Sequence, residues 1–194
     1  MEADGRPKLW VVRHGETEWA RLGRHTGRTD IPLTRRGREQ AVAVGKRLSG
    51  HPFALVLSSP LARALDTARR AGFADRIETT DDLLEWDYGA DEGRTTTEIQ
   101  LDRPGWTIWG DGPLRGEAVE HVGKRVDRVI QRARAADGDA LVFAHGHVLR
   151  ILAARWLGAP ANDGRLYALS TATVSVLGWE RDQAVLERWN DTAD

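Results

Sequence analysis

The sequence contains no cysteine, which excludes disulfides, thiolate nucleophiles and cysteine-based zinc or iron–sulfur sites. Lysine is scarce, with three residues against 25 arginines. Neither sign of charge is in excess, because 28 basic and 29 acidic side chains leave a formal net charge of −1. Near-neutral charge argues against a protein that binds nucleic acid by bulk electrostatics.

Long hydrophobic runs are also missing near the start of the chain. Residues 1–8 are polar, and the apolar run at 9–12 is too short for a signal peptide or a membrane span. We therefore expect a cytoplasmic protein without a membrane partner, either monomer or homodimer. The length of 194 residues, 41% of them hydrophobic, predicts one domain over 1–194, with a core over about 8–190 and a short polar N-terminal tail.

The balanced charge hides two local excesses. Residues 21–47 carry eight basic and two acidic side chains, whereas residues 81–102 carry one basic and eight acidic ones. A solvated helix face explains most of the basic stretch better than a nucleic-acid surface does. Arg24 and Arg28 are the two arginines of this stretch that we expect to point inward.

Buried strands and amphipathic helices alternate along the chain. Thr34 is a good helix N-cap, Pro60 fits a first helical turn, and Gly72 and Gly158 are helix stops. Strands are predicted at 9–12, 54–57, around Ile77, 140–144, 174–179 and 184–189. Helices are predicted at 35–48, 60–71, 117–136 and up to Trp156–Leu157, with a short helical piece at 95–102 and loop at 14–33. This order predicts an α/β fold with a mostly parallel central sheet and an antiparallel edge.

Polar, chemically competent residues follow three of these strands: His14 after the first, Ser58–Pro60 after the second and His145–His147 after the fourth. Ligands of open α/β sheets bind at the carboxyl ends of strands. Arg63 lies on the first turn of the helix that Pro60 opens, and helix N-termini bind anions. If the three strands are neighbours, these residues form a phosphate or carboxylate pocket.

Two histidines among arginines suit phosphoryl transfer. A neutral imidazole is a nucleophile toward phosphorus, and positive neighbours disfavour the imidazolium. Arginines also stabilise the oxygens of a transferring phosphoryl group. Glu85 lies among apolar and aromatic residues (Leu-Leu-Glu-Trp-Asp-Tyr-Gly, 83–89), a setting that favours the protonated carboxyl of a general acid.

Four motifs, in order along the chain, resemble those of the histidine phosphatase (phosphoglycerate mutase-like) superfamily. They are Val-Arg-His-Gly-Glu-Thr-Glu-Trp at 12–19, Ser-Ser-Pro-Leu-Ala-Arg-Ala at 58–64, Leu-Glu-Trp-Asp-Tyr-Gly at 84–89 and Ala-His-Gly at 144–146. The likeness spans about 8–180. With the loop at 23–34, it looks most like the subgroup of sedoheptulose-bisphosphatase-like and broad acid phosphatases.

The resemblance implies a three-layer α/β/α sandwich and a phosphatase that needs no metal or other cofactor and acts on small phosphorylated metabolites. It implies that His14 forms a phosphohistidine, that Glu85 is the acid and then the base, and that Arg13, Arg63 and His145 complete the catalytic set. Substrate or phosphate contacts are implied for Arg13, Thr17, Thr26, Gly27, Arg63, Glu85, His145 and Gly146. Further candidate substrate contacts are Arg24, His25, Tyr88 and His147.

Two features depart from the family pattern or leave alternatives open. The family often has Asn after the Trp of the first motif, where this chain has Ala20. The spacing from Glu85 to His145 is 60 residues (145 − 85), and the middle contains Arg94, Arg103 and Arg115 but no lysine-rich clamp. In the family that the chain resembles, cofactor-dependent phosphoglycerate mutases carry a longer insertion there, with extra basic residues that clamp a second phosphate. The resemblance therefore implies a phosphatase rather than such a mutase. A weakly catalytic member that binds phosphorylated ligands is the remaining alternative.

Several residues have a simple structural interpretation as well as a functional one. His145–His147 is also a metal-binding pattern, but no matching Asp or His occurs in another motif, so we expect no metal. His25 either contacts substrate or is an ordinary loop residue. His51 and His121 are expected on the surface. Trp106 and Trp109 either roof the pocket or, as we prefer, pack beneath a long loop.

Overall fold

The computed structural model describes residues 5–192, so residues 1–4 of the polar start and residues 193–194 lie outside the described residues. Its centre is one six-stranded sheet in the order β3-β2-β4-β1-β5-β6. The first four strands of that order run parallel, and β5 and β6 are antiparallel to their neighbours. The strands are β1 (Leu9–Arg13), β2 (Leu55–Ser58), β3 (Glu78–Thr79), β4 (Ala140–Ala144), β5 (Thr173–Glu180) and β6 (Gln183–Thr192).

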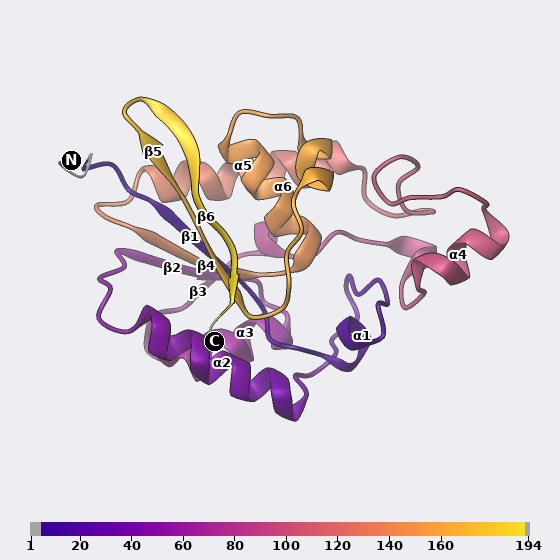
Figure 1. The fold of residues 1–194 in the computed structure, drawn as a ribbon, viewed down its shortest axis with the longest axis horizontal. Coiled ribbons are helices and arrows are strands. Elements are labelled where there is room, and N and C mark those ends of the chain that lie inside the picture. The colour runs from indigo at the N-terminus through magenta and orange to yellow at the C-terminus, as the bar shows by residue number, and fades with distance from the viewer. Residues whose placement is uncertain (1–4, 193–194) are drawn as a thin grey trace.

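Helices cover both faces of the sheet, so the predicted α/β fold with an antiparallel edge is confirmed (Figure 1). The helices are α1 (Glu18–Arg21), α2 (Arg35–Leu48), α3 (Ala62–Ala68), α4 (Thr96–Asp102), α5 (Val119–Arg134) and α6 (Gly146–Trp156). A π-helical turn (Arg69–Phe73) continues α3, and 3₁₀ turns lie at Ala74–Arg76, Asp81–Leu83, Gly89–Asp91 and Ala161–Leu166.

Alternate residues of the central strands fill two separate cores. Val11 and Val142 belong to the core beneath α5 and α6, whereas Val12 and Phe143 belong to the core beneath α2 and α3. Since successive side chains of a strand point to opposite faces, a strand covered on both faces must be apolar throughout. This explains the continuous apolar runs of β1 and β4.

Some boundaries differ from the sequence prediction. The helix after Pro60 begins only at Ala62 and gives way at Arg69 to the π-helical turn, inside which Gly72 has a φ of +94°. The third strand is Glu78–Thr79 rather than a strand through Ile77, and both of its residues are exposed. Such end residues pack against little, so apolar patterning alone does not locate them.

The strand register aligns the three predicted functional segments. Arg13 at the end of β1 pairs with Ala144 at the end of β4, and Ser58 at the end of β2 pairs with Phe143. Strands β2, β4 and β1 are therefore neighbours, as the sequence argument required. The residues that follow them meet at one edge of the sheet.

Candidate active site

His14 follows β1 directly and is buried, with 4% of its surface exposed. Its Nδ1 lies 2.8 Å from the Gly15 carbonyl oxygen, which can only accept, so Nδ1 carries the proton and Nε2 keeps its lone pair. Burial, followed by the neighbouring guanidinium groups of Arg63 and Arg13, holds the pKa of His14 well below its usual range. His14 is therefore a neutral imidazole with an unprotonated Nε2.

His145 and Arg63 form a second, fully buried pair beside His14. The two histidine rings have centroids 5.2 Å apart. Arg63 Nε donates to His145 Nδ1 at 3.0 Å, so the neutral ring carries its proton on Nε2, which lies 2.7 Å from Ser59 Oγ. Burial and the charge of Arg63 also hold the pKa of His145 well below its usual range.

The remaining donors of Arg63 hold the loop that follows the first motif. Nη1 donates to the carbonyl of Thr29, and Nη2 donates to those of Thr26 and Gly27. Four of the five N–H donors of Arg63 are thus bonded to protein atoms. In this structure Arg63 and His145 are bonded to each other, to Ser59 and to the loop carbonyls, and so act as structural supports beside His14. Direct contact of either residue with a phosphoryl oxygen stays a prediction.

Arg13 reaches the cavity from the last residue of β1. Its Nη1 donates to the Leu169 carbonyl, whereas its Nε is buried with no hydrogen-bond partner within residues 5–192. A buried N–H without an acceptor costs free energy. Arg13 therefore keeps one buried N–H donor that no protein acceptor satisfies within the described residues.

Glu85 is buried, but its surroundings differ from the apolar pocket that the sequence suggested. Its carboxylate accepts three backbone N–H groups: Trp86 on Oε1, Val148 on Oε1 and His147 on Oε2. Two of these donors are at the N-terminus of α6, which favours negative charge. Oε1 thus accepts two bonds and Oε2 one, which leaves Oε2 a lone pair that can carry a proton.

A cavity of about 180 Å³ joins most of these groups. Its lining residues are Arg13, His14, Ala20, Gly23, Arg24, His25, Thr26, Glu85, Tyr88, Gly146, His147, Arg150 and Leu169. The structure therefore brings Arg13, His14 and Glu85 to one space. Among the other candidates, Thr26, Arg24, His25, Tyr88, Gly146 and His147 also line it.

Thr17 and Gly27 do not line this cavity. The Thr17 side chain caps α1 by accepting the Ala20 N–H. The Gly27 N–H donates to both carboxylate oxygens of Glu92. Their predicted phosphate contacts stay predictions, since the groups that would make them are bonded to protein partners here.

The expectation for the two loop arginines holds for one of them. Arg24 lines the cavity and forms an ion pair with Glu98 at 3.1 Å. The prediction that Arg28 points inward is wrong, because Arg28 is exposed and its Nε lies 3.8 Å from Asp87 Oδ2.

Aromatic rings form one wall of the cavity. The Tyr88 hydroxyl and His147 Nδ1 share a hydrogen bond of 2.6 Å, so Tyr88 orients the His147 ring. His25 packs against Tyr88 and stacks on His147. Burial holds the pKa of His147 well below its usual range and lowers that of His25.

The two tryptophans of the long middle segment pack behind this wall. Trp106 is buried and contacts His25 edge to face, while Trp109 contacts His147. Neither lines the cavity, so packing is the better description, as preferred above. Of the two other histidines, His121 is exposed, but His51 is half-buried and bonds Asp139 at 2.8 Å.

Sequence reasoning missed three residues that the structure places at the site. Ser59 bonds His145. Arg150 lines the cavity, with its guanidinium 4.7 Å above the Trp109 ring. Arg125 on α5 donates to the backbone of Glu85. Ser59 stood inside a quoted motif, and Arg150 lies one helical turn after Gly146, so strand-end and helical spacing point to both; Arg125 has no comparable signal.

The described residues contain neither a cluster of metal ligands nor a helix that could span a membrane. Within 5–192, no three His, Asp or Glu side chains are grouped to hold a metal ion. No helix in the same range has the length and hydrophobicity to cross a membrane.

The candidate active site joins an unprotonated imidazole nitrogen, an unsatisfied guanidinium N–H and a carboxyl group in one cavity. These groups are suited to nucleophilic transfer of an anionic group.

Comparison with known proteins points in the same direction. An acid phosphatase of Mycobacterium tuberculosis is 40% identical over 92% of this chain and 91% of its own length. A sedoheptulose 1,7-bisphosphatase of Saccharomyces cerevisiae is 36% identical over 78% of this chain and 68% of its own. A probable phosphoglycerate mutase of Salmonella paratyphi A is 30% identical over 94% and 89%.

A solved structure and a family model agree with these relatives. A Mycobacterium tuberculosis protein superposes with a TM-score of 0.90 and 37% identity, over 97% of this chain and 99% of the other. The model of the histidine phosphatase superfamily, branch 1, matches residues 9–192. The resemblance inferred from the four motifs is thereby confirmed, and the chain belongs to branch 1 of the histidine phosphatase superfamily.

Proposed function

We propose that this protein hydrolyses phosphate monoesters of small metabolites through a phosphohistidine on His14, without a metal ion. The observation that carries the proposal is the hydrogen bond from His14 Nδ1 to the Gly15 carbonyl, because it leaves the Nε2 lone pair for attack on phosphorus. The low pKa of His14 supports it, since the imidazole stays unprotonated at neutral pH. We also propose that residues 1–194 form one domain, which the six-stranded sheet within residues 5–192 supports.

In the first step, His14 Nε2 attacks phosphorus and the bond from phosphorus to the ester oxygen breaks. Glu85 Oε2 donates a proton to the departing oxygen, which leaves as an alcohol. Oε2 accepts a single backbone N–H, that of His147, so it has a lone pair that can hold this proton. The N–H of Arg13 without a partner, together with Arg63 and His145, would stabilise charge on the phosphoryl oxygens.

In the second step, water attacks the phosphohistidine and Glu85 accepts a proton from that water. The nitrogen–phosphorus bond breaks, inorganic phosphate leaves, and Nε2 regains its lone pair. The same carboxyl thus serves as acid and then as base. The phosphatase names of two relatives support hydrolysis as the net reaction.

Phosphoglycerate mutase is the second candidate, because a relative at 30% identity is a probable mutase. A mutase holds an intermediate with two phosphates, which calls for free cationic groups around the site. Two arginines of the middle segment are already neutralised here, Arg94 by Asp102 and Arg103 by Asp91. This pairing favours the phosphatase.

The test is phosphate release from sugar phosphates, bisphosphates, phosphoglycerates and an aryl phosphate by the wild type and by His14→Asn. Asparagine can still donate to the Gly15 carbonyl but has no group that replaces Nε2 as nucleophile. We expect kcat to fall by about 10³-fold or more for every ester that the wild type hydrolyses. His121→Asn, at an exposed site on α5, should change nothing.

Four outcomes test the proposal and its alternatives. Hydrolysis that survives in folded His14→Asn contradicts the nucleophile. Isomerisation of phosphoglycerates that depends on a bisphosphoglycerate primer and exceeds hydrolysis identifies a mutase. Binding of the esters without turnover of any of them identifies a ligand-binding member. Loss of activity with a chelator contradicts metal independence.

A further inference from the structure

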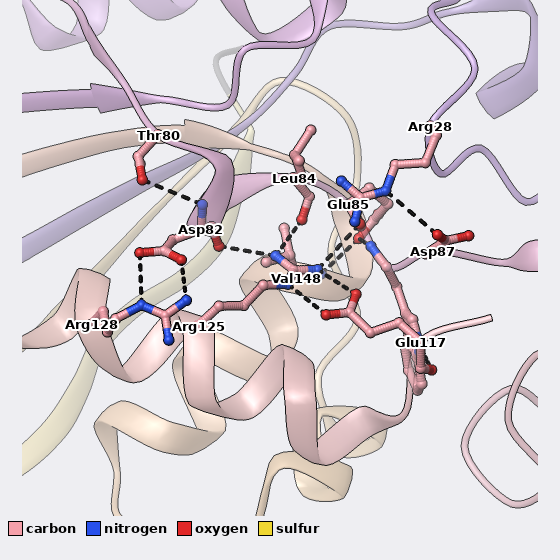
Figure 2. Close-up of polar contacts among 11 residues, drawn as sticks. Arg28, Thr80, Asp82, Leu84, Glu85, Asp87, Glu117, Arg125, Arg128 and Val148 are labelled. Atoms are coloured by element: carbon pink, nitrogen blue, oxygen red, sulfur yellow. Dashed lines mark hydrogen bonds and ion pairs between the residues drawn. The ribbon is translucent and has the colours of Figure 1, made fainter.

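The segment that carries Glu85 is held from two directions. On one side, the Glu85 carboxylate bonds the backbone N–H groups of His147 and Val148 at the start of α6. On the other side, the backbone carbonyls of the same segment face α5 (Figure 2). We call residues 82–87 the acid loop. It has no helix or strand beyond the turn at Asp81–Leu83, so its shape depends on such contacts.

Arg125 makes the contacts on the α5 side. Its Nη1 donates to the carbonyls of Asp82, at 2.9 Å, and Leu84, and its Nη2 donates to the Glu85 carbonyl at 3.2 Å. Nε and Nη2 also donate to the two carboxylate oxygens of Glu117, each at 3.0 Å. Figure 2 shows this fan of bonds between α5 and the acid loop. All five N–H donors of the guanidinium are therefore used.

Glu117 fastens the other end of the acid loop. Its backbone N–H donates to the Asp87 carbonyl at 2.9 Å, and its carbonyl accepts the Trp86 indole N–H at 2.6 Å. Arg125 is 7% exposed, so its bonds to Glu117 and the loop are shielded from water. Arg125 and Glu117 therefore belong to one hydrogen-bond network that surrounds the backbone of Glu85.

Arg128 lies one turn further along α5 and provides an internal comparison. It also bonds the acid loop, but it contacts only the carboxylate of Asp82, and its side chain is 58% exposed. Both arginines connect the same helix to the same loop. Only Arg125 touches the backbone of Glu85.

We propose that Arg125 is a positioning residue for Glu85, setting the place of its carboxyl group through the backbone carbonyls of the acid loop. The inference rests on the proposed function, in which Glu85 protonates the leaving oxygen. Displacement of a proton donor by an ångström is enough to weaken proton transfer strongly. Lysine keeps the charge but has three donors from one nitrogen, so it cannot hold Glu117 and three carbonyls at once.

The experiment compares Arg125→Lys with Arg128→Lys as the matched control. The readout is kcat/KM for p-nitrophenyl phosphate, phenyl phosphate and glycerol 2-phosphate, whose leaving groups need progressively more help from an acid. For Arg125→Lys we expect a loss of about 10-fold to 100-fold with glycerol 2-phosphate and less than about threefold with p-nitrophenyl phosphate. Inhibition by inorganic phosphate should stay within about twofold, because Arg13 and His14 are untouched.

Glu85→Gln separates the failure of this inference from failure of the proposed function. If Glu85→Gln shows no dependence on the leaving group, the acid role itself is wrong. If it shows that dependence and Arg125→Lys does not, the positioning role is overturned. In the double variant Arg125→Lys/Glu85→Gln, the losses should not add, because both act on one group; additive losses also overturn it.

A general structural role predicts a different pattern. Folded Arg125→Lys that loses activity equally with all three esters contradicts positioning of the acid. If Arg125→Lys fails to fold, Glu117→Gln takes its place, since it retains the guanidinium while removing the charge that orients it. The same dependence on the leaving group, at smaller amplitude, is then expected. Equal losses in folded Glu117→Gln overturn the inference.

Discussion

At the scale of single residues, the site depends on keeping histidines neutral inside the protein. His14, His145 and His147 are each buried, and burial is the largest cause that holds their pKa values well below the usual range. Two of them also lie beside Arg63 or Arg13. The same environment that preserves the Nε2 lone pair of His14 thus opposes protonation of all three rings.

Because the native state keeps these three imidazoles unprotonated, we predict that the free energy of unfolding falls as pH falls. Below an unfolded-state pKa of about 6.5 the unfolded chain binds protons that the native state excludes, so the free energy of unfolding decreases. Between pH 7.5 and 5.5 each of the three histidines should cost about 1.4 kcal/mol. Urea unfolding in phosphate-free buffer at the two pH values measures the loss.

A variant isolates the contribution of one ring. His147→Asn keeps an acceptor for the Tyr88 hydroxyl and removes the titrating group, so its loss over the same pH interval should be smaller by about 1.4 kcal/mol. His121→Asn, at an exposed position, serves as the control. Equal losses in the wild type and His147→Asn contradict a neutral, buried His147.

At the scale of elements, α2 packs so closely that it shapes the loop holding His14. A Cβ at Gly37 would lie 2.1 Å from the Glu16 carbonyl oxygen, and a Cβ at Gly15 would lie 2.3 Å from that of Gly37. The Glu16 N–H donates to Gln40 on α2, and the Gly15 N–H donates to Thr67 on α3. The position of the Gly15 carbonyl, which fixes the His14 tautomer, follows from this packing.

Gly37→Ala should therefore displace the loop and lower kcat by about 10-fold or more. Gly45→Ala is the matched control, because a Cβ there meets the Ala71 carbonyl at 2.6 Å on the same helix, away from the site. Both variants should melt at a lower temperature. Only Gly37→Ala should lower kcat in the folded protein, and an equal kcat for the two variants would contradict the coupling of α2 to His14.

The same elements show where sequence reasoning succeeds. Continuous apolar runs identified β1 and β4, and Thr34 identified the start of α2, because a buried strand and a side-chain cap are local requirements. The support of Glu85 escaped prediction. Its carboxylate is bonded by N–H groups some 60 residues later and its carbonyl by Arg125, and no local pattern reports such contacts.

At the scale of the whole molecule, the order of the sheet brings the chemistry together. His14, Arg63 and His145 come from segments after β1, β2 and β4, which are neighbours in the sheet. The sequence predicted this convergence because the carboxyl ends of neighbouring parallel strands lie at one edge of a sheet. The family was inferred separately, from four motifs in order along the chain. The prediction that Arg28 points inward was wrong, because it rested on the position of Arg28 in the loop alone, and that position does not report the exposed contact with the distant Asp87.

The central claim is a covalent phosphate on His14 Nε2, and trapping tests it most directly. The enzyme is mixed with an activated aryl phosphate, quenched within milliseconds in alkali, and digested for mass spectrometry. We predict one phosphate on the peptide containing His14, stable in base and lost in acid, and none in His14→Asn. Turnover of the aryl phosphate with no phosphate on His14 at any quench time, or with phosphate on another residue, would contradict the account.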